Sequence, residues 1–438
     1  MAGAAGLWLR FGAPAWHTAR VQALGLALLL LAATVAGLYL VWDPGEWRRR
    51  LARLVLLGAT SGLCLALLEA PAVLGAHDYA ASFGVDGQDT WLQLARRINR
   101  PDPELIHIHW PHSHYADQVR GNLAFLGIPD PPLHPVDLHY DQYGFRNDRD
   151  LERADVVVIG DSFVEAALVT TQQSVTGQLA ALLGRTVANR GQSAYGLRQE
   201  LAVLERYGLP LSPGLVVWML FGGNDLRDVR ATDWARAHFE ELQQPRPLRK
   251  RLFLRNALLF LAERVGWMDE FHGRERARAR SASWLLPDGT KRVVYFGQPT
   301  PPWDEREWRV ATSTLQKAQE ETREAGADFL LVFIPRKFTV YRGLLVDPGA
   351  DVARWKDVKL GPALGSFARQ AGIPFLDTTP ALRAALRRGE EVYFPDDVHW
   401  TAAGHRIAAE QIAARLGSLQ RGSSGDAPPE IARGGAQK

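Results

Sequence analysis

Three short apolar runs, each followed at once by small or polar residues, constrain the fold of this chain most strongly. The runs are 154–159, 185–189 and 215–221, and their β-branched and apolar residues predict buried strands. Predicted helices at 173–183 and 197–207 separate them. Strands that alternate with helices indicate a parallel sheet with right-handed crossovers. The loops after the strands then meet at one edge, where open α/β sheets build their sites.

The alternation is interrupted between residues 228 and 308 and then resumes. Inside this insertion, residues 246–280 hold ten Arg or Lys against four acids, and 252–267 is apolar on one side. A lid over the site, a basic helix on anionic lipid and an exposed insertion are all compatible with this pattern. The later elements expected are helices at 307–325 and 361–371, strands at 329–334 and 374–376, and a helix ending near 416.

Two apolar runs near the N-terminus predict a membrane anchor at 21–76, after an N-terminal segment at 1–20. Residues 21–42 are uncharged and long enough to cross about 30 Å of hydrocarbon. The second run, 54–76, contains Glu69 and Pro71, and a carboxylate at the bilayer centre would cost about 2.5–3.5 kcal/mol. Because Glu69 lies near the end of the run, we predict two transmembrane helices.

Arginines predict the orientation of these helices. Arg48, Arg49, Arg50 and Arg53 lie between the two runs, whereas no Arg or Lys follows the second run until Arg96. The positive-inside rule then places the chain after residue 77 outside the cytoplasm. A single anchor with a cytoplasmic domain is the alternative.

Composition argues against nucleic acid, disulfides and cysteine-bound metal. The formal net charge of +3 is small for 438 residues, and we find no nucleic-acid-binding motif. The single cysteine, Cys64, excludes internal disulfides. Four closely spaced histidines suggest a metal site, but no carboxylate spacing completes a familiar one. We therefore expect no metal and no cofactor; the histidines are His107, His109, His112 and His114.

Ser162 and His399 are the candidate nucleophile and base. Ser162 directly follows the first predicted strand in a Gly-Asp-Ser sequence. A serine hydroxyl becomes nucleophilic when a histidine takes its proton, and the imidazole needs a carboxylate to fix its tautomer. Asp396 and Asp397, three and two residues before His399, are both candidates for this acid.

Donors for a developing oxyanion follow the same strands. The candidates are the Ser162 N–H, the Gly191 N–H and the side-chain amide of Asn224. Each motif alone is weak, because short sequences of this kind occur by chance. Four elements in order, three of them directly after predicted strands, are a much stronger signal.

These four elements resemble those of the SGNH (GDSL-like) hydrolase superfamily. The matching blocks are Gly160–Phe163, Gly191, Gly222–Asp225 and Asp396–His399, and the resemblance covers about 140–416. It implies a three-layer α/β/α fold with a parallel sheet. It also implies a nucleophilic Ser162, oxyanion donors from Gly191 and Asn224, and His399 as the base.

The C-terminal half is similar to alginate and other polysaccharide O-acetylation proteins. The similarity rests on Ile334–Tyr341 and on the Asp-x-His-Trp run that ends at Trp400. In that branch the acid lies two residues before the histidine, which favours Asp397. The Asp-x-x-His spacing of the wider superfamily favours Asp396 instead.

We therefore expect a serine esterase or O-acyltransferase that acts through an acyl-serine on acyl, in particular acetyl, esters of a cell-envelope glycan. The expected location is the bacterial cytoplasmic (inner) membrane, with the catalytic domain extracytoplasmic. The expected domains are a linker at 77–139, a hydrolase-like domain at 140–416 and a disordered tail at 417–438.

The expected partners are an acylated glycan or other ester, membrane lipid at the anchor, and a multi-span protein that supplies acyl groups. Two alternatives stay open. One is a non-catalytic glycan-binding or assembly module with the same fold. The other is a lipid-directed esterase that docks through its basic insertion.

Overall fold

The structure is a computed structural model that describes residues 37, 47–83, 98–244, 246–264 and 267–423. The chain divides into two compact units. One comprises residues 1–97 and 240–271, and the other comprises residues 98–239 and 272–438. The larger unit contains every predicted catalytic residue.

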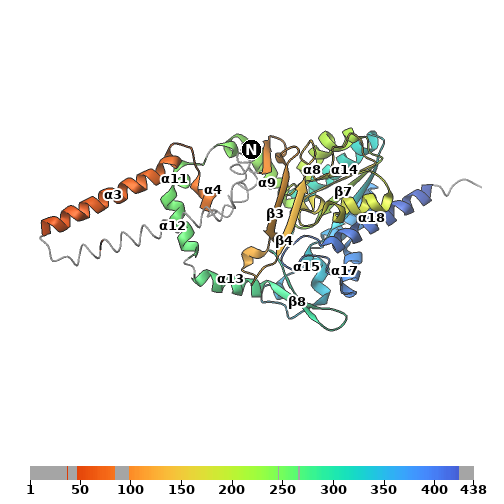
Figure 1. Ribbon diagram of the computed structural model, residues 1–438. Helices are drawn as coiled ribbons and strands as arrows, with labels where there is room; N and C mark the ends of the chain where they lie inside the picture. The colour runs from red at the N-terminus through yellow and green to blue at the C-terminus, as the bar shows by residue number, and fades with distance from the viewer. Residues whose placement is uncertain (1–36, 38–46, 84–97, 245, 265–266, 424–438) are drawn as a thin grey trace, which may run out of the picture. The chain divides into compact units, whose positions relative to one another are not determined.

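A five-stranded, wholly parallel sheet forms the centre of the larger unit (Figure 1). Its order is β12-β10-β7-β5-β6. The predicted α/β fold with a parallel sheet is confirmed, and all five predicted strands are present. Their bounds are β5 Val156–Gly160, β6 Val187–Gly191, β7 Leu215–Phe221, β10 Asp328–Ile334 and β12 Phe375–Asp377.

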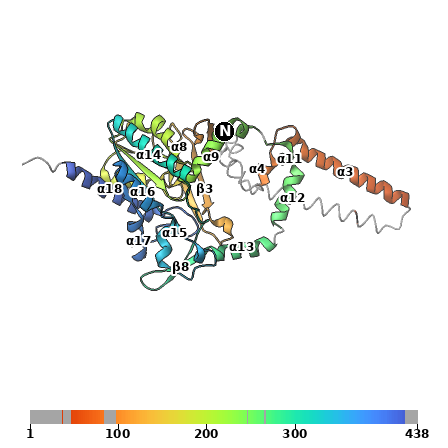
Figure 2. The same cartoon turned by 180° about the vertical axis from the view of Figure 1, so that it is seen from behind.

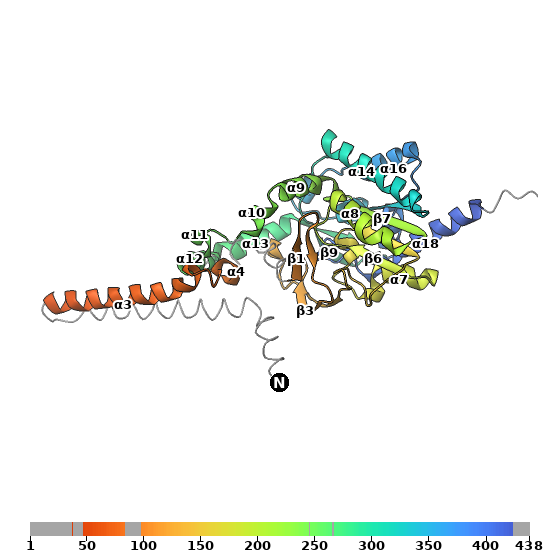
Figure 3. The same ribbon diagram turned by 90° about the horizontal axis from the view of Figure 1, so that it is seen from above.

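Helices cover both faces of this sheet. On one face, α7, α17 and α18 pack against alternate strand residues such as Val158 and Val217. Figure 3 shows α7 and α18 near β6 and β7. On the other, α8, α9, α14 and α16 pack against Val157 and Trp218 (Figure 2). The bounds are α7 Val175–Leu183, α8 Leu197–Val203, α9 Asp225–Ala237, α14 Glu305–Glu324, α16 Leu360–Ala371, α17 Thr379–Arg387 and α18 Ala402–Ser423. Burial on both faces explains why β5 and β7 are continuously apolar.

The strand order reverses at β5. From β5 the chain moves to β6 on one side and then crosses to β7 on the other. Such a reversal leaves a crevice at the carboxyl ends of the strands, the usual ligand position in open α/β sheets. Ser162 begins the short helix α6, Ser162–Glu165, directly beyond the end of β5.

Small antiparallel sheets occupy regions for which the sequence predicted no strands. The expected linker contains the ribbons β1–β2 and β3–β4. The expected insertion contains β8 and β9, which pair with each other, and β8 also pairs with β11. Their bounds are β1 Asn99–Asp102, β2 Ile106–His109, β3 His114–Arg120, β4 Leu133–His139, β8 Ser281–Leu285, β9 Lys291–Tyr295 and β11 Leu345–Val346. Three further helices are α10 Phe239–Gln243, α13 Trp267–Ala279 and α15 Lys337–Tyr341.

In the smaller unit, the long helix α3 packs with α4 and α12 around a compact core, and the short helix α11 directly precedes α12. The helices are α3 Trp47–Val73, α4 Tyr79–Phe83, α11 Leu248–Arg251 and α12 Phe253–Arg264. Phe83 and Phe253 pack together in this core. The Glu69 carboxylate accepts hydrogen bonds from the N–H groups of Phe253 and Leu254, at 2.7 and 2.9 Å. Glu69, whose carboxylate was predicted to carry a free-energy cost in a membrane span, therefore caps α12.

Within the described residues, α3 is the one helix long and apolar enough to cross a membrane. It begins at Trp47, so it includes the arginines that were expected in a loop. The other predicted span, residues 21–42, lies outside the described residues except for Gly37. The described residues thus contain one candidate span, and the span at 21–42 stays a prediction.

Candidate active site

The turn after β5 fixes the position of Ser162. A Cβ added to Gly160 would lie 2.8 Å from the Met219 carbonyl oxygen, so no larger residue fits there without a shift. Asp161 then caps helix α6, because its Oδ1 accepts a hydrogen bond from the Phe163 N–H at 3.0 Å. Burial raises the pKa of Asp161 to about 6. The turn therefore leaves the Ser162 side chain at the carboxyl edge of the sheet.

Ser162, His399 and Asp397 form a continuous hydrogen-bonded chain. Ser162 Oγ lies 2.7 Å from His399 Nε2, and His399 Nδ1 lies 2.5 Å from Asp397 Oδ1. An ionised carboxylate only accepts hydrogen bonds, so Nδ1 carries the proton and Nε2 is left to accept from the serine hydroxyl. The structure thus brings together three residues that are up to 237 positions apart.

Charge stabilises the histidine and the carboxylate in their ionised forms. Burial lowers the pKa of His399, but the adjacent Asp397 outweighs burial and raises it above its ordinary value. Burial raises the pKa of Asp397, but His399 and the Asn122 N–H outweigh it and lower that pKa below its ordinary value. The Asn122 N–H donates to Asp397 Oδ2 at 2.5 Å. A proton received at His399 Nε2 is therefore stabilised by a fixed negative charge.

Asp396 occupies a different environment from Asp397. Its carboxylate accepts hydrogen bonds from His134 Nε2 at 3.0 Å and from the Gly121 N–H at 3.2 Å. Its backbone carbonyl accepts from the Leu123 N–H at 3.0 Å. Asp396 thus ties its loop to the segment around Gly121, while Asp397 faces His399.

Lys337, which sequence reasoning did not single out, forms hydrogen bonds with the loop that carries Asp397. Its ammonium group donates to the carbonyl oxygens of Phe394, Pro395 and Asp397 at 2.6, 2.9 and 2.9 Å. Burial lowers the pKa of Lys337 to about 7. The only sequence signal was its place in the run that follows the fourth strand.

The predicted oxyanion donors are not equally available. Gly191 N–H donates to Asn189 Oδ1 at 2.8 Å, so this N–H already has an acceptor within the protein. Asn224 donates one amide hydrogen to Asp228 Oδ2, which leaves its other amide hydrogen to donate. No described residue accepts a hydrogen bond from the Ser162 N–H. The Gly191 N–H thus has an acceptor within the protein, whereas the Ser162 N–H and one amide hydrogen of Asn224 have none among the described residues.

Gly191 also allows close packing. A Cβ at this position would lie 2.5 Å from the Glu165 nitrogen, so helix α6 contacts the backbone of β6 directly.

Three residues later, Ala194 has a φ of 66° and is exposed. A left-handed backbone at a residue other than glycine costs of order 1–3 kcal/mol and tends to occur near functional sites.

A buried Glu165–His109 pair stabilises helix α6, which begins at Ser162. Glu165 accepts hydrogen bonds from His109 Nε2, the Tyr140 hydroxyl and the Ser193 N–H, at 2.9, 2.9 and 2.7 Å. Burial raises the pKa of Glu165, but His109 and Ser193 outweigh it and lower the pKa to about 2. The sequence contained no signal for this pair, because its members lie 56 residues apart.

The four clustered histidines do not share one site. Burial lowers the pKa of His107 to about 4, and its Nε2 lies 3.0 Å from the Ser193 carbonyl oxygen. His109 pairs with Glu165, and the other two histidines are exposed. The acidic neighbours of those two, His112 and His114, are Asp150 and Asp137.

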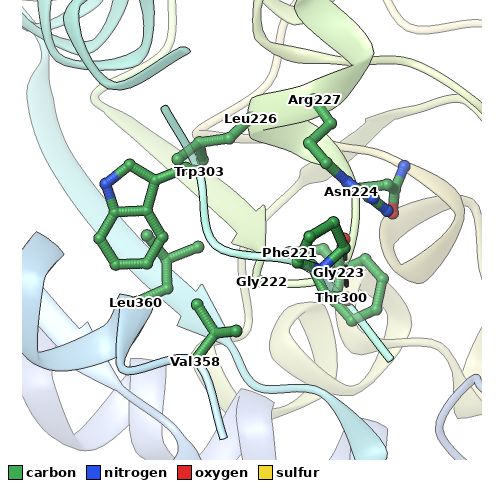
Figure 4. A pocket seen from close by; sticks show the side chains of 11 residues that line it. Phe221, Gly222, Gly223, Asn224, Leu226, Arg227, Thr300, Trp303, Val358 and Leu360 are labelled. Carbon is green, nitrogen blue, oxygen red and sulfur yellow. Dashed lines mark hydrogen bonds between the residues drawn. The ribbon is translucent and has the colours of Figure 1, made fainter. Parts of the chain in front are cut away.

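A small pocket adjoins Asn224. Its lining includes Trp303 and Leu360 on one side and Asn224 with Arg227 on the other (Figure 4). Ser162 and His399 are not among its lining residues. The wall is mainly apolar, with Asn224, Arg227 and Thr300 as its polar side chains.

Comparison with known proteins supports the sequence resemblance. Residues 284–431 match the family model described as the SGNH hydrolase-like domain, acetyltransferase AlgX. This match confirms a resemblance to SGNH hydrolases with an AlgX-like C-terminal part. It supports an enzyme that acts on ester bonds, as a hydrolase or as an acyltransferase. No curated protein matches the chain.

Several solved structures match this chain at low identity and low TM-score. A catalytic mutant of the acetylxylan esterase Axe2 from Geobacillus stearothermophilus is 18% identical, with a TM-score of 0.31, and the alignment covers 61% of this chain and 96% of Axe2. A GDSL-like lipase from Bacteroides thetaiotaomicron is 15% identical, with a TM-score of 0.30 and coverage of 61% and 89%. These values are too low to decide the substrate of this chain.

Proposed function

We propose that this protein is a membrane-anchored serine esterase or O-acyltransferase that acts on acyl esters, in particular acetyl esters, of a cell-envelope glycan. The observation that carries the proposal is the chain from Asp397 through His399 to Ser162, with both contacts at hydrogen-bond distance. Acyl transfer requires an accessible serine and an imidazole oriented to take its proton. Here the serine lies on a tight turn at the carboxyl edge of the parallel sheet.

In the first half-reaction, Ser162 Oγ attacks the acyl carbonyl carbon while His399 Nε2 takes the hydroxyl proton. The carbonyl oxygen becomes an oxyanion, to which the Ser162 N–H and the Asn224 amide donate hydrogen bonds. When the tetrahedral intermediate collapses, the bond to the leaving alkoxide breaks and His399 returns the proton to that oxygen. The acyl group is then esterified to Ser162 and the alcohol leaves.

In the second half-reaction, His399 takes a proton from water or from a sugar hydroxyl, and the resulting oxygen nucleophile attacks the acyl-serine. Collapse releases the acid or the acylated sugar and returns the proton to Ser162. Hydrolysis and transfer differ only in this acceptor.

Two observations support the choice of substrate. The matching family model is named for an acetyltransferase, which favours acetyl as the acyl group. Helix α3 provides a candidate membrane anchor, which favours a substrate close to the cell envelope.

The test is ester hydrolysis and acetyl transfer by the purified full-length protein in detergent. An aryl acetate serves as the donor, and cell-envelope glycan serves as the acceptor. We expect Ser162→Ala and His399→Ala to lower the rate by about a thousandfold or more, and Asn224→Ala by about a hundredfold or more. Ser366→Ala, which changes an exposed serine on α16, is the matched control. Equal rates for Ser162→Ala and the wild type would contradict the mechanism.

A lipid-directed esterase is the second candidate, because α12 exposes apolar side chains. Leu258 and Leu259 are 53% and 37% exposed on this helix, and the preceding α11 carries Arg249, Lys250 and Arg251. The double variant Leu258→Ser/Leu259→Ser tests this candidate. Loss of activity on ester lipid in anionic vesicles, with activity on a soluble ester retained, would favour the lipid substrate.

A further inference from the structure

The outer face of the β3–β4 ribbon carries three side chains that can bind metal. His114 and His139 lie directly opposite each other in the antiparallel register. Asp137 lies two residues before His139 on the same strand, and alternate residues of a strand share a face. The register thus gathers His114, Asp137 and His139 on one surface.

Their ligand atoms converge on a single point. Asp137 Oδ1 lies 2.6 Å from His114 Nε2 and 3.3 Å from His139 Nε2. The three atoms all lie within 4.8 Å of one another. The two imidazole rings are stacked, with centroids 4.1 Å apart and planes at 9°.

This face is open to solvent, whereas the opposite face of the ribbon is packed. Both histidine side chains are 52% exposed and Asp137 is 70% exposed. Val136, Leu138 and Tyr140, which alternate with Asp137 and His139, are buried on the other face. Because the three side chains are exposed, hydrophobic packing does not account for their convergence. An exposed His–Asp contact also gains little free energy in water. An ion can reach the three groups directly.

We propose that His114, Asp137 and His139 bind a divalent transition-metal ion, with Zn²⁺ as the expected ion. Two imidazole nitrogens and one carboxylate oxygen are typical zinc ligands. Tetrahedral zinc with bonds of about 2.0–2.1 Å separates its ligand atoms by about 3.3 Å. The observed spacing needs only small side-chain rotations to reach this geometry, and water completes the fourth position.

Such an ion would link the two strands of the ribbon. The inner face of the same ribbon carries His134, which contacts the Asp396 carboxylate at 3.0 Å. Asp396 belongs to the loop that holds Asp397 and His399. The ion would therefore stiffen the ribbon that supports this loop.

The test is zinc binding by the full-length protein in detergent after removal of metal with a chelator. Zn²⁺ is titrated in competition with a chromophoric chelator. The variants are His114→Ala, Asp137→Asn and His139→Ala, all at exposed positions. His112→Ala is the matched control, because His112 is an exposed histidine of the same segment that does not join the cluster.

We expect the wild type to hold one Zn²⁺ that each site variant binds roughly tenfold more weakly or worse. His112→Ala should bind like the wild type, and Zn²⁺ should raise the thermal midpoint of the wild type but not that of the site variants. X-ray absorption should show nitrogen and oxygen ligands at about 2.0–2.1 Å. The proposal is overturned if the wild type takes up no Zn²⁺, or if a His114→Ala/His139→Ala variant binds it with unchanged affinity.

Discussion

Lys337 shapes the loop that presents Asp397 and His399. Its three ammonium hydrogens are matched by three carbonyl oxygens of that loop. A methionine at this position would fill a similar volume but leave the three carbonyls without their donor, and unpaired buried polar groups are costly. Lys337 is thus a positioning residue for the acid and the base.

Lys337→Met should lower kcat by about tenfold to a hundredfold with little change in KM, because the loop moves while the substrate contacts remain. Steady-state kinetics on an aryl acetate measures both constants. Lys317→Met, at an exposed lysine of α14, is the matched control. A folded Lys337→Met protein with wild-type kcat would show that the lysine does not position the loop.

The pKa of His399 predicts the acid limb of the activity profile. The base must be neutral to take the serine proton, and Asp397 raises the pKa of His399 above the ordinary value of 6.5. Activity should therefore rise with pH through a midpoint above 6.5, and acid should remove it by protonating His399. The measurement is kcat/KM for a neutral ester across this range. A midpoint at or below 6.5 would contradict the electrostatic account.

At the scale of residues, the serine and the histidine were predictable because each lies in a short, ordered motif. The choice between Asp396 and Asp397 was not, because both carboxylates precede His399 on one loop. The two carboxylates differ because His134, which lies 262 residues from Asp396, forms a hydrogen bond with the Asp396 carboxylate. The Gly191 N–H was assigned from its motif alone, which did not indicate that the side chain of Asn189, two residues away, accepts a hydrogen bond from it.

At the scale of elements, α12 depends on a cap from another helix. Glu69 in α3 satisfies two N–H groups at the first turn of α12, which otherwise lack partners. Glu69→Ala should destabilise α12 by about 1 kcal/mol. Hydrogen exchange of the backbone amides of 253–260 should then become faster than in the wild type.

Glu69→Gln is the matched variant, because its amide oxygen can still accept a hydrogen bond but carries no charge. Its exchange rates should lie between those of Glu69→Ala and the wild type. Unchanged exchange in Glu69→Ala would mean that the cap does not hold this helix.

The central strands were predictable because both faces are buried, which makes each strand a continuous apolar run such as Leu215–Phe221. Strands β8 and β9 were missed because they mix Ser, Arg and Lys with apolar residues, and only one side of each is buried. Helix α17 was missed as well. It is short, and Pro380 at its start reads equally well as a turn.

At the scale of the whole molecule, the division into units could not be predicted from the sequence. Residues 240–271 were assigned to an insertion in the hydrolase-like domain, yet they cluster with the N-terminal segment. One contact that joins this stretch to the N-terminal segment is the hydrogen bond between Glu69 and Phe253, which lie 184 residues apart. The basic composition of this stretch carries no information on that pairing.

Helix α3 makes the orientation of the chain testable. Arg48, Arg49, Arg50 and Arg53 at its start should stay in the cytoplasm, so the chain beyond residue 77 should lie outside. Reporter fusions after residues 45 and 80 should be active in the cytoplasm and outside it, respectively. A cytoplasmic signal from the fusion after residue 80 would contradict an extracytoplasmic catalytic unit.

The most direct test of the account is covalent labelling of the full-length protein with a serine-reactive phosphonate, followed by mass spectrometry. Wild type, Ser162→Ala and His399→Ala are compared, with Ser366→Ala as the control for an exposed serine. The account predicts one adduct, on Ser162, that is lost in Ser162→Ala, strongly slowed in His399→Ala and unchanged in Ser366→Ala. A folded wild-type protein without an adduct on Ser162 would contradict an activated nucleophile and favour a non-catalytic module.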